Sequence, residues 1–391
     1  MAETARRRIF LVAGEESGDQ LGAKLMRALR ARLGSDSMQF EGVGGHRMAG
    51  EGLASLFLLD EIAVMGISAV VPRIPKILNR IAFTADAVLR SKPDVLVIID
   101  SPDFTHRVAR RVRASDASIP IIDYVSPSVW AWRPGRAKAM RSYVDHVLAL
   151  LPFEPDAHRR LSGPPTTYVG HPLIERLDDL RPTPSERPRL GDSPVRLLVL
   201  PGSRRSEVSR LMEPFGQALA VLNAAGISLE VTIPAVERLA GEIAGRVKSW
   251  TVPVSIVRGE EAKWAAFRSA QVALAASGTV TLELALSGIP MVVAYKVTPL
   301  EWFLRFLVTV PSVVLANLVL RDNIIPELLQ EACTGERLAD ALLPLMRDTP
   351  ARSRQVAAFA RLDELMTIGD ETPSGRAARI IDSVVTGIQS R

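Results

Sequence analysis

Residues 272–283 read VALAASGTVTLE, an apolar run that passes through a Ser-Gly-Thr turn into the start of a helix. An apolar run followed by a glycine turn is typical of a buried strand that leads into a helix. Such a turn directs backbone N–H groups toward an anion, and the helix dipole adds to the attraction. Glu283 lies one helical turn after Thr279, where we expect its carboxylate to meet the hydroxyls of a ribose behind the phosphates.

A second turn of the same kind occurs at residues 200–205, LPGSRR, after another apolar run. Two such turns, each at the end of a strand, predict a nucleotide held by its diphosphate. The alternative is that each is an ordinary glycine turn followed by a helix N-cap, because short glycine motifs are frequent.

Both halves of the chain alternate apolar strands with helical segments. Strands are expected at 9–13, 95–99, 119–124 and 147–151, and then at 196–200, 229–233, 254–257, 272–274 and 291–294. Near-continuous apolar strands between helices indicate parallel sheets covered on both faces. The fold class is therefore α/β, with two Rossmann-like domains facing a cleft and ligands at the carboxyl ends of the strands.

Proline content suggests where the domains divide. Residues 176–195 hold four prolines among charged residues and are interpreted as an interdomain linker. The prediction is an N-terminal Rossmann-like domain at 1–175, this linker, and a C-terminal Rossmann-like domain at 196–370. An amphipathic helix at 371–391 could cross back to the first domain.

Composition excludes several classes of protein. The single cysteine, Cys333, rules out an internal disulfide or a cysteine metal cluster, and the five histidines are scattered, so no metal is expected. Aromatic residues make up only 5%, which does not favour a nucleic-acid stacking surface. The net charge of +5 suits phosphorylated substrates or anionic lipid headgroups, although codon bias in a GC-rich genome would also enrich arginine. No twenty-residue stretch lacks both charge and proline, so no membrane span is predicted.

Asp100 follows directly on the apolar run 95–99. A carboxylate at the carboxyl end of a buried strand lies where a cleft opens, so Asp100 is a candidate general base. The alternative is a turn or helix-capping residue.

Residues 124–136 contain two tryptophans, two prolines and two arginines in an apparent loop. Indole rings pack against sugars and arginines hold phosphates, which favours a substrate-binding loop. The alternative is that the tryptophans seal the domain beneath the loop.

Residues 64–78 form an apolar segment interrupted by basic residues. The segment is too short and too rich in proline to span a bilayer. Such a composition is typical of an interfacial segment that contacts lipid, and equally of a buried core helix. The mean hydropathy of +0.15 favours some exposed apolar surface.

These blocks together resemble a known family. They are residues 13–19, 64–66, 99–104, 124–132, 170–172, 200–204 and 277–283, with Asn317, and they span nearly the whole chain in order. The chain closely resembles bacterial lipid-A-disaccharide synthases, which are inverting glycosyltransferases of the GT-B fold. It departs from that pattern at Gly44-Gly45-His46 and at Arg205.

The resemblance implies a reaction between UDP-2,3-diacylglucosamine and 2,3-diacylglucosamine 1-phosphate that forms a β-1,6-linked disaccharide and UDP. No metal or other cofactor is implied, because the UDP-sugar is a substrate. The implied location is the cytoplasm, peripheral on the inner membrane with its anionic lipids. The implied assembly is a monomer or a homodimer.

The resemblance also implies roles for single residues. Asp100 matches the proposed general base, Arg204 the phosphate-binding arginine and Glu283 the ribose contact. Nucleotide binding is further assigned to Ser203, Ser277, Gly278, Thr279 and Asn317. The acceptor or donor-sugar side is assigned to Glu16, Ser17, Gly18, Asp19, Met65, Ser126, Trp130, Trp132 and Arg133. Membrane or acyl contact is assigned to Val64, Ile67, Val70, Val71, Ile74 and Ile77.

Two other functions fit parts of the pattern. A UDP-sugar 2-epimerase would use the same fold, but the apolar segment around Met65 disfavours it. A lipid or nucleotide carrier would need pockets but no base at Asp100. Release of UDP from acylated substrates separates the three.

Overall fold

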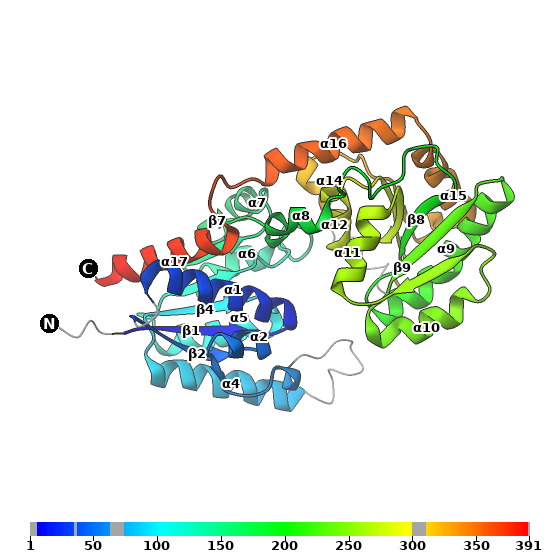
Figure 1. The fold of residues 1–391 in the computed structure, drawn as a ribbon. Coiled ribbons are helices and arrows are strands. Elements are labelled where there is room, and N and C mark those ends of the chain that lie inside the picture. The colour runs from blue at the N-terminus through cyan, green and yellow to red at the C-terminus, as the bar shows by residue number, and fades with distance from the viewer. Residues whose placement is uncertain (1–5, 35–36, 63–73, 299–309, 390–391) are drawn as a thin grey trace. The chain divides into compact units, whose positions relative to one another are not determined.

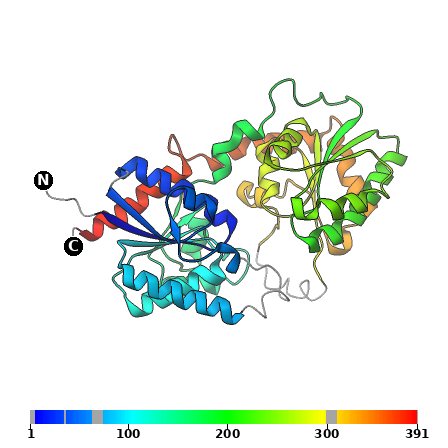
Figure 2. The same cartoon turned by 60° about the horizontal axis from the view of Figure 1, so that its bottom comes forward.

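The computed structural model describes residues 6–34, 37–62, 74–298 and 310–389. The chain divides into two compact units (Figures 1 and 2). The first unit contains the chain up to Glu175 and again from Ile368, and the second is Arg176–Thr367. The chain therefore passes between the units twice.

The first unit is built on a seven-stranded parallel sheet in the order β3-β2-β1-β4-β5-β6-β7. Its strands are β1 Arg7–Ala13, β2 Met38–Val43, β3 Ala54–Ser55, β4 Val95–Ile99, β5 Ile121–Tyr124, β6 His146–Ala149 and β7 Thr166–Tyr168. Its α-helices are α1 Glu16–Leu33, α2 His46–Gly50, α4 Ile74–Ser91, α5 Pro102–Ser115, α6 Gly135–Met140, α7 Glu154–Arg160 and α17 Pro373–Gln389. Short 3-10 turns lie at η2 Leu59–Glu61 and η4 Pro172–Arg176.

Alternation along the central strands explains why both faces of this sheet carry helices. In β1, Ile9 and Leu11 join the core beneath α1 and α17, whereas Phe10 and Val12 join the core beneath α4 and α5. Figure 1 shows α1 and α17 on one side of the sheet and α4 on the other. Strands buried on both faces are apolar throughout, which is the pattern of a parallel sheet.

The C-terminal helix α17 belongs to the first unit and packs against α1. Its buried face consists of Ala377, Ala378, Ile381 and Val385. Asp382 on the same helix pairs with Arg7 at 2.6 Å and with Arg32 at 2.9 Å. The amphipathic tail is thus a layer of the first unit.

The second unit has a six-stranded parallel sheet in the order β10-β9-β8-β11-β12-β13. Its strands are β8 Val195–Leu200, β9 Leu229–Pro234, β10 Val254–Val257, β11 Val272–Ala276, β12 Met291–Tyr295 and β13 Glu327–Leu329. Its α-helices are α8 Leu177–Leu180, α9 Arg205–Ala224, α10 Glu237–Val247, α11 Glu260–Ser269, α12 Val280–Leu286, α14 Leu315–Leu320, α15 Gly335–Leu342 and α16 Pro350–Met366. The 3-10 turns η6 Gln330–Ala332 and η7 Leu343–Met346 flank α15.

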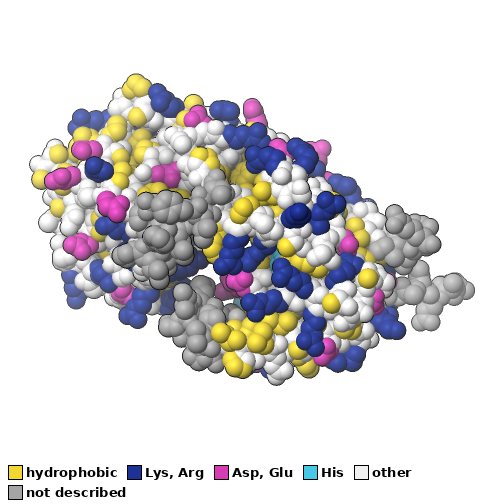
Figure 3. Space-filling view, turned by 180° about the vertical axis from the view of Figure 1, so that it is seen from behind, with side chains coloured by type: hydrophobic (Ala, Val, Ile, Leu, Met, Phe, Trp, Pro, Cys, Tyr) yellow, Lys and Arg dark blue, Asp and Glu magenta, His cyan; other side chains and the backbone are white. Residues whose placement is uncertain are grey.

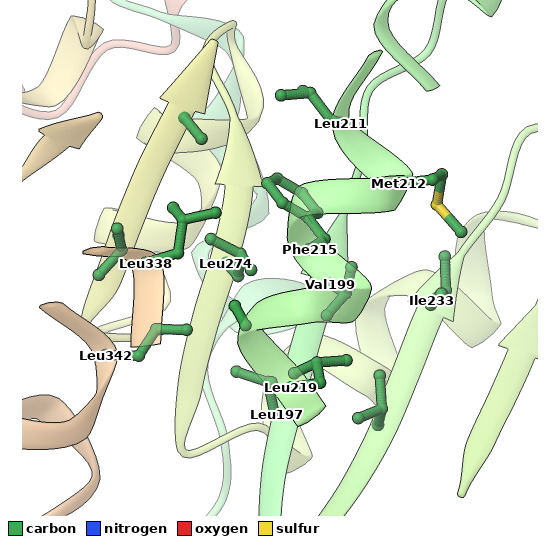
Figure 4. Packing of buried hydrophobic residues seen from close by; sticks show 14 of the residues in the cluster. Leu197, Val199, Leu211, Met212, Phe215, Leu219, Ile233, Leu274, Leu338 and Leu342 are labelled. Atoms are coloured by element: carbon green, nitrogen blue, oxygen red, sulfur yellow. The ribbon is translucent and has the colours of Figure 1, made fainter. Parts of the chain in front are cut away.

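Helix α9 anchors the core on one face of this sheet. Figure 4 shows Phe215 and Leu219 of α9 directed at Val199 of β8 and Leu274 of β11, with Leu338 of α15 beside them. These side chains are buried, so α9 and α15 pack in the same core as the strands β8 and β11, which lead into the glycine turns.

Residues 176–195 differ from the predicted linker, because they pack on the second unit. The Arg187 guanidinium donates to the carbonyls of Gly288 at 3.1 Å and Ser287 at 2.9 Å. Arg181 donates to the Leu286 carbonyl at 3.1 Å. After α8 the prolines interrupt regular structure, but arginines of the segment satisfy carbonyls at the end of α12, which fixes the segment on the second unit.

Within the described ranges, no helix has the length and apolarity that crossing a bilayer requires.

The packing of α17 predicts a local effect of the substitution Ile381→Ala. Ile381 is fully buried, and truncating such a residue costs about 2–5 kcal/mol. Hydrogen exchange measured by mass spectrometry should become faster in β1 and β4 and stay unchanged in β8 and β11. The control is Ser383→Ala, at an exposed position of the same helix. Unchanged exchange in β1 would contradict the structural role of α17.

Candidate active site

The second unit contains a pocket of about 670 Å³ at the edge of its sheet where β8, β9 and β11 end. Its lining comes from the segments 200–207, 234–237, 259–263 and 276–283. Parallel strands end at one edge, so the loops that follow them gather there, and α/β proteins bind ligands at this place. Six of the seven predicted nucleotide-binding residues line this pocket, namely Ser203, Arg204, Ser277, Gly278, Thr279 and Glu283.

The turn after β8 is organised around Glu207, which sequence reasoning missed. The carboxylate of Glu207 accepts the backbone N–H groups of Ser203 at 3.0 Å and Arg204 at 3.1 Å. Gly202 has φ +109°, and a Cβ there would lie 2.4 Å from Oε2 of Glu207, so only glycine fits. These two N–H groups are therefore not the open donors that the glycine pattern predicts.

Arg204 still reaches the pocket through its side chain. The Arg204 side chain is 60% exposed, and its Nη1 lies 3.0 Å from Oε1 of Glu207. A guanidinium has five N–H donors in a planar fork, which suits a phosphate. The predicted role of Arg204 thus rests on its side chain and not on the turn's backbone.

The second turn, Ser277–Thr279, joins β11 to α12 and lies in the pocket wall. The Ser277 hydroxyl donates to the Val313 carbonyl at 2.6 Å, which fixes the turn to the segment before α14. Gly278 and Thr279 are exposed at the amino end of α12. This turn has the position that the sequence predicts.

Glu283 lies one turn into α12 and is paired with Lys263 of α11. The Lys263 Nζ and the Glu283 Oε2 are 2.6 Å apart. The pair forms one wall of the pocket. Sequence reasoning missed Lys263, because nothing local marks a partner twenty positions away on another helix.

Each of the four glutamates that line the pocket has a basic partner. The pairs are Glu207–Arg204, Glu237–Arg258, Glu260–Arg176 and Glu283–Lys263. Neutralised carboxylates repel an anion far less than isolated ones, since opposite charges within a few ångströms cancel at longer range. The pocket is therefore compatible with a phosphate-bearing ligand despite its acidic residues.

Asn317 is the predicted nucleotide-binding residue that does not line this pocket. It is buried, and its Nδ2 donates to the Ile325 carbonyl and to Glu327 Oε1, both at 3.0 Å. Its Oδ1 accepts the Ile325 N–H at 3.0 Å. Because the amide is used at both ends to tie α14 to the start of β13, Asn317 is a structural residue here.

In the first unit, Asp100 follows β4 in a strained turn. Asp100 and Ser101 have φ of +55° and +46°, the left-handed region that costs on the order of 1 kcal/mol per residue. Asp100 Oδ2 accepts the Ser17 hydroxyl at 2.7 Å, and Oδ1 accepts the Ser101 N–H at 2.7 Å. A Cβ at Gly14 would lie 2.3 Å from the Ser101 Cβ, so a glycine is needed for this approach. Strain held by such contacts is common at functional sites.

The predicted acceptor motif at residues 16–19 separates into different roles. Glu16 and Ser17 are exposed. Asp19 is buried, and its carboxylate accepts the N–H groups of Gly45, Arg47 and Met48 at 2.7–3.0 Å. Asp19 therefore caps α2 and is not available to a substrate, contrary to the prediction. Gly18 permits close packing of α1 on β4, since a Cβ there would lie 3.1 Å from the Ile99 carbonyl oxygen.

The loop 126–136 is anchored by a buried polar cluster of Ser126, Trp130, Glu154 and His158. The Ser126 hydroxyl lies 2.8 Å from His158 Nε2, and Trp130 Nε1 donates to Glu154 Oε1 at 3.1 Å. Ser126 is buried and Trp130 packs on Phe153 with ring centroids 5.1 Å apart. Ser126 is used internally and matches the sealing alternative, whereas Trp130 is half-buried and its predicted substrate role stays a prediction.

Among the loop residues assigned to substrate binding, Trp132 and Arg133 face solvent. Trp132 is 38% exposed, and the Arg133 guanidinium lies 4.0 Å from the centre of its indole ring. This cation–π pair presents one planar cation and one aromatic face together. The role of Trp132 and Arg133 in substrate binding stays a prediction.

A buried carboxyl group lies on β5, next to the strand that ends at Asp100. Asp123 is buried, with Oδ2 3.3 Å from His106 Nε2, and His106 Nδ1 lies 3.1 Å from the Tyr143 hydroxyl. Burial raises the pKa of Asp123, and the nearby Asp100 charge adds to that direction. This chain of polar groups lies beneath the candidate base and was not anticipated from sequence.

The remaining predicted residues lie outside the described ranges or on α4. Met65, Val64, Ile67, Val70 and Val71 are outside the residues that the structure describes. Ile74 is exposed, whereas Ile77 is partly buried against the core of the first unit, so Ile77 does not match its predicted membrane role. Among the described side chains, no three of His, Cys, Asp or Glu could hold a metal ion together.

Two parallel-sheet α/β units, with a ligand-sized pocket at the carboxyl edge of the second, define the GT-B class of proteins. Solved structures support this class. The UDP-GlcNAc 2-epimerase from Neisseria meningitidis is similar with a TM-score of 0.61 at 14% identity, covering 97% of this chain and 100% of that one. MurG from Acinetobacter baumannii is similar with a TM-score of 0.56 at 14% identity, covering 98% and 100%.

Sequence comparison then identifies the family. The profile of the lipid-A-disaccharide synthetase family matches residues 9–381, and the chain belongs to this family of glycosyltransferases. The lipid-A-disaccharide synthase of Rhodopseudomonas palustris CGA009 is 58% identical over 97% of this chain and 96% of its own. That of Paramagnetospirillum magneticum is 44% identical over 98% of this chain and 99% of its own.

The buried cluster behind the loop predicts a pH dependence of stability. Burial raises the pKa of Glu154 from 4.5 to about 7, and burial lowers the pKa of His158 to about 4, so His158 is neutral. The protonated form of Glu154 is favoured in the folded state. Its contribution to stability is complete below pH 4.5 and is lost as pH rises through about 7.

We therefore expect Glu154→Gln to abolish part of this dependence. Relative to the variant, the native protein should lose about 3 kcal/mol of unfolding free energy between pH 4.5 and 8, since each pKa unit is worth about 1.4 kcal/mol. Urea denaturation at both pH values measures this change in unfolding free energy. The control is Asp156→Asn, a more exposed position on the same helix. Parallel pH profiles for the native protein and Glu154→Gln would contradict the assignment.

Proposed function

We propose that the protein transfers 2,3-diacylglucosamine from UDP-2,3-diacylglucosamine to 2,3-diacylglucosamine 1-phosphate, with inversion, forming the β-1,6-linked disaccharide and UDP. One observation carries the proposal. In a chain of this family, the second unit has a pocket of about 670 Å³ that gathers two glycine turns, Arg204 and the Glu283–Lys263 pair.

The leaving group is assigned to this pocket. The Arg204 guanidinium and the Ser277–Thr279 turn would bind the diphosphate, and Glu283 would accept hydrogen bonds from the ribose hydroxyls. As the bond between the anomeric carbon and the diphosphate oxygen breaks, negative charge grows on UDP. Preorganised donors of this kind stabilise such charge and lower the barrier.

Proton acceptance is assigned to Asp100 in the first unit. The acceptor's hydroxyl oxygen forms the new bond to the anomeric carbon while its proton passes to the Asp100 carboxylate. The transition state has oxocarbenium character, as in glycoside hydrolysis. Hydrogen bonds from Ser17 and the Ser101 N–H at 2.7 Å orient the carboxylate, which supports this role because a general base must be held in place.

The assay is UDP release with acylated donor and acceptor together, with the product identified by mass and by its anomeric coupling. We expect UDP only when both substrates are present, and activity that persists in EDTA, because the proposal uses side chains and backbone N–H groups on the diphosphate. Formation of a 2-epimerised UDP-sugar without disaccharide would contradict transfer.

In the same assay, Asp100→Asn should lower turnover by about 10²–10⁴-fold, the usual contribution of a general base. Asparagine tolerates the left-handed backbone of this position, so the variant should keep the fold. Asp103→Asn is the matched control, because Asp103 lies on the first turn of α5 with its side chain 87% exposed. Native-like turnover of Asp100→Asn would remove Asp100 from the base role.

We further propose that the protein acts on the cytoplasmic face of the inner membrane, where both acylated substrates reside. Leu58 is 76% exposed and Leu78 on α4 is 48% exposed. Figure 3 shows hydrophobic side chains gathered at the lower edge of the first unit, where Figure 1 places α4. The basic Lys76 and Arg80 lie on the same helix, and such a surface is typical of interfacial contact.

The double substitution Leu58→Ser and Leu78→Ser should therefore reduce binding to vesicles containing phosphatidylglycerol by about tenfold or more, since each inserted leucine contributes on the order of 1–2 kcal/mol. Vesicle sedimentation measures binding, and thermal denaturation checks the fold. Val356→Ser, at a 44% exposed position of α16, is the matched control. Equal sedimentation of the double variant and the native protein would count against this surface.

A further inference from the structure

The ion pair between Lys263 and Glu283 carries a further inference, which rests on the proposed function. Lys263 Nζ lies 2.6 Å from Glu283 Oε2 in the pocket wall. Oε2 of Glu283 is buried and accepts no hydrogen bond of normal geometry from the described residues. Its partner is therefore the ammonium charge of Lys263. The lysine side chain is 28% exposed and the glutamate side chain 14% exposed, which shields the pair from solvent on most sides.

The lysine is confined at the pocket by aromatic rings. Its Nζ lies 4.4 Å from the ring centre of Trp264 and 5.3 Å from that of Phe267. Both rings are buried, and they stack edge to face with centroids 5.6 Å apart. A lysine has a flexible four-carbon stem, and cation–π contact limits the positions its ammonium can take. The carboxylate and the two rings therefore fix this charge in one place.

The position of the pair matters for a nucleotide. The contact with the Lys263 ammonium fixes one oxygen of the Glu283 carboxylate in the pocket wall. A carboxylate can accept hydrogen bonds on both of its oxygens. Glu283 paired in this way retains acceptor capacity for a vicinal diol.

We propose that Lys263 is a positioning residue of the nucleotide site. It holds the Glu283 carboxylate in the orientation that accepts hydrogen bonds from the two ribose hydroxyls. Lys263 acts through Glu283, so its effect on affinity depends on the presence of the ribose hydroxyl and not only on the phosphate charge.

The test measures binding of UDP and of 2′-deoxy-UDP by isothermal titration calorimetry to the native protein and to Lys263→Met. We expect Lys263→Met to weaken UDP by about tenfold, the effect of losing one charge-assisted hydrogen bond. Affinity for 2′-deoxy-UDP should fall less than about threefold, because this ligand already lacks one of the two hydroxyls that Glu283 is positioned to bind. Lys248→Met, an exposed lysine at the end of α10, should change neither affinity.

Two further variants keep the test decisive. Lys263→Gln retains a polar side chain of similar length and should show the same selective loss if Lys263→Met does not fold. In a Glu283→Gln background, Lys263→Met should have little additional effect on UDP, since the residue it positions is gone. In turnover, Lys263→Met should raise KM for the UDP-sugar and leave kcat nearly unchanged.

Equal weakening of UDP and 2′-deoxy-UDP would overturn the inference, because Lys263 would then act on the phosphates directly. Unchanged affinity of Lys263→Met for both ligands would overturn it as well. Failure of the native protein to bind UDP would instead overturn the proposed function, and this outcome is seen before any variant is compared.

Discussion

Parallel strands that end at a common edge are the constraint on which both candidate sites depend. In each unit a helix begins within a few residues of a central strand, and the chain must turn sharply there. The turn brings the backbone so close to a neighbouring side chain that glycine is required at Gly14 and Gly202. Polar groups that the sequence separates by up to about 80 positions, such as Ser17 and Asp100, are thereby placed in contact.

Paired charges resolve an apparent contradiction in the second unit. A pocket lined by four glutamates is a poor place for a phosphate unless those charges are compensated. Each glutamate has a basic partner, and the partners come from different elements, such as Arg258 after β10 and Arg176 before α8. Isolated surface pairs contribute little to stability. Their role here is to set the local charge, and Arg204, although paired with Glu207, keeps further N–H donors on a side chain that is 60% exposed.

The sequence predicts the strands and turns well, because these depend on local pattern. The apolar runs 95–99 and 254–257 coincide with β4 and β10, and the two glycine turns lie in one pocket as expected. The sequence predicts the roles of single polar residues less well. Asp19, Asn317 and Ser126 stand in motifs that suggest substrate contact, yet each bonds to its own unit. Whether a polar side chain faces a ligand or a distant backbone group depends on tertiary contacts that spacing does not encode. Ile77 shows the same limit, since the helix period that exposes Ile74 and Leu78 turns Ile77 toward the core.

The motif at residues 14–19 shows how such structural residues serve a site indirectly. Gly14 admits the strained turn, Gly18 allows α1 to approach β4, and Asp19 fixes the start of α2 beside them. Ser17 is then presented to Asp100 at 2.7 Å. A turn with two consecutive left-handed residues is unfavourable by itself and persists only where its surroundings determine it. The motif is therefore better understood as the support that holds Asp100 in place than as a set of groups that each touch the substrate. Its glycines and its buried acid are needed for the same reason as its exposed serine.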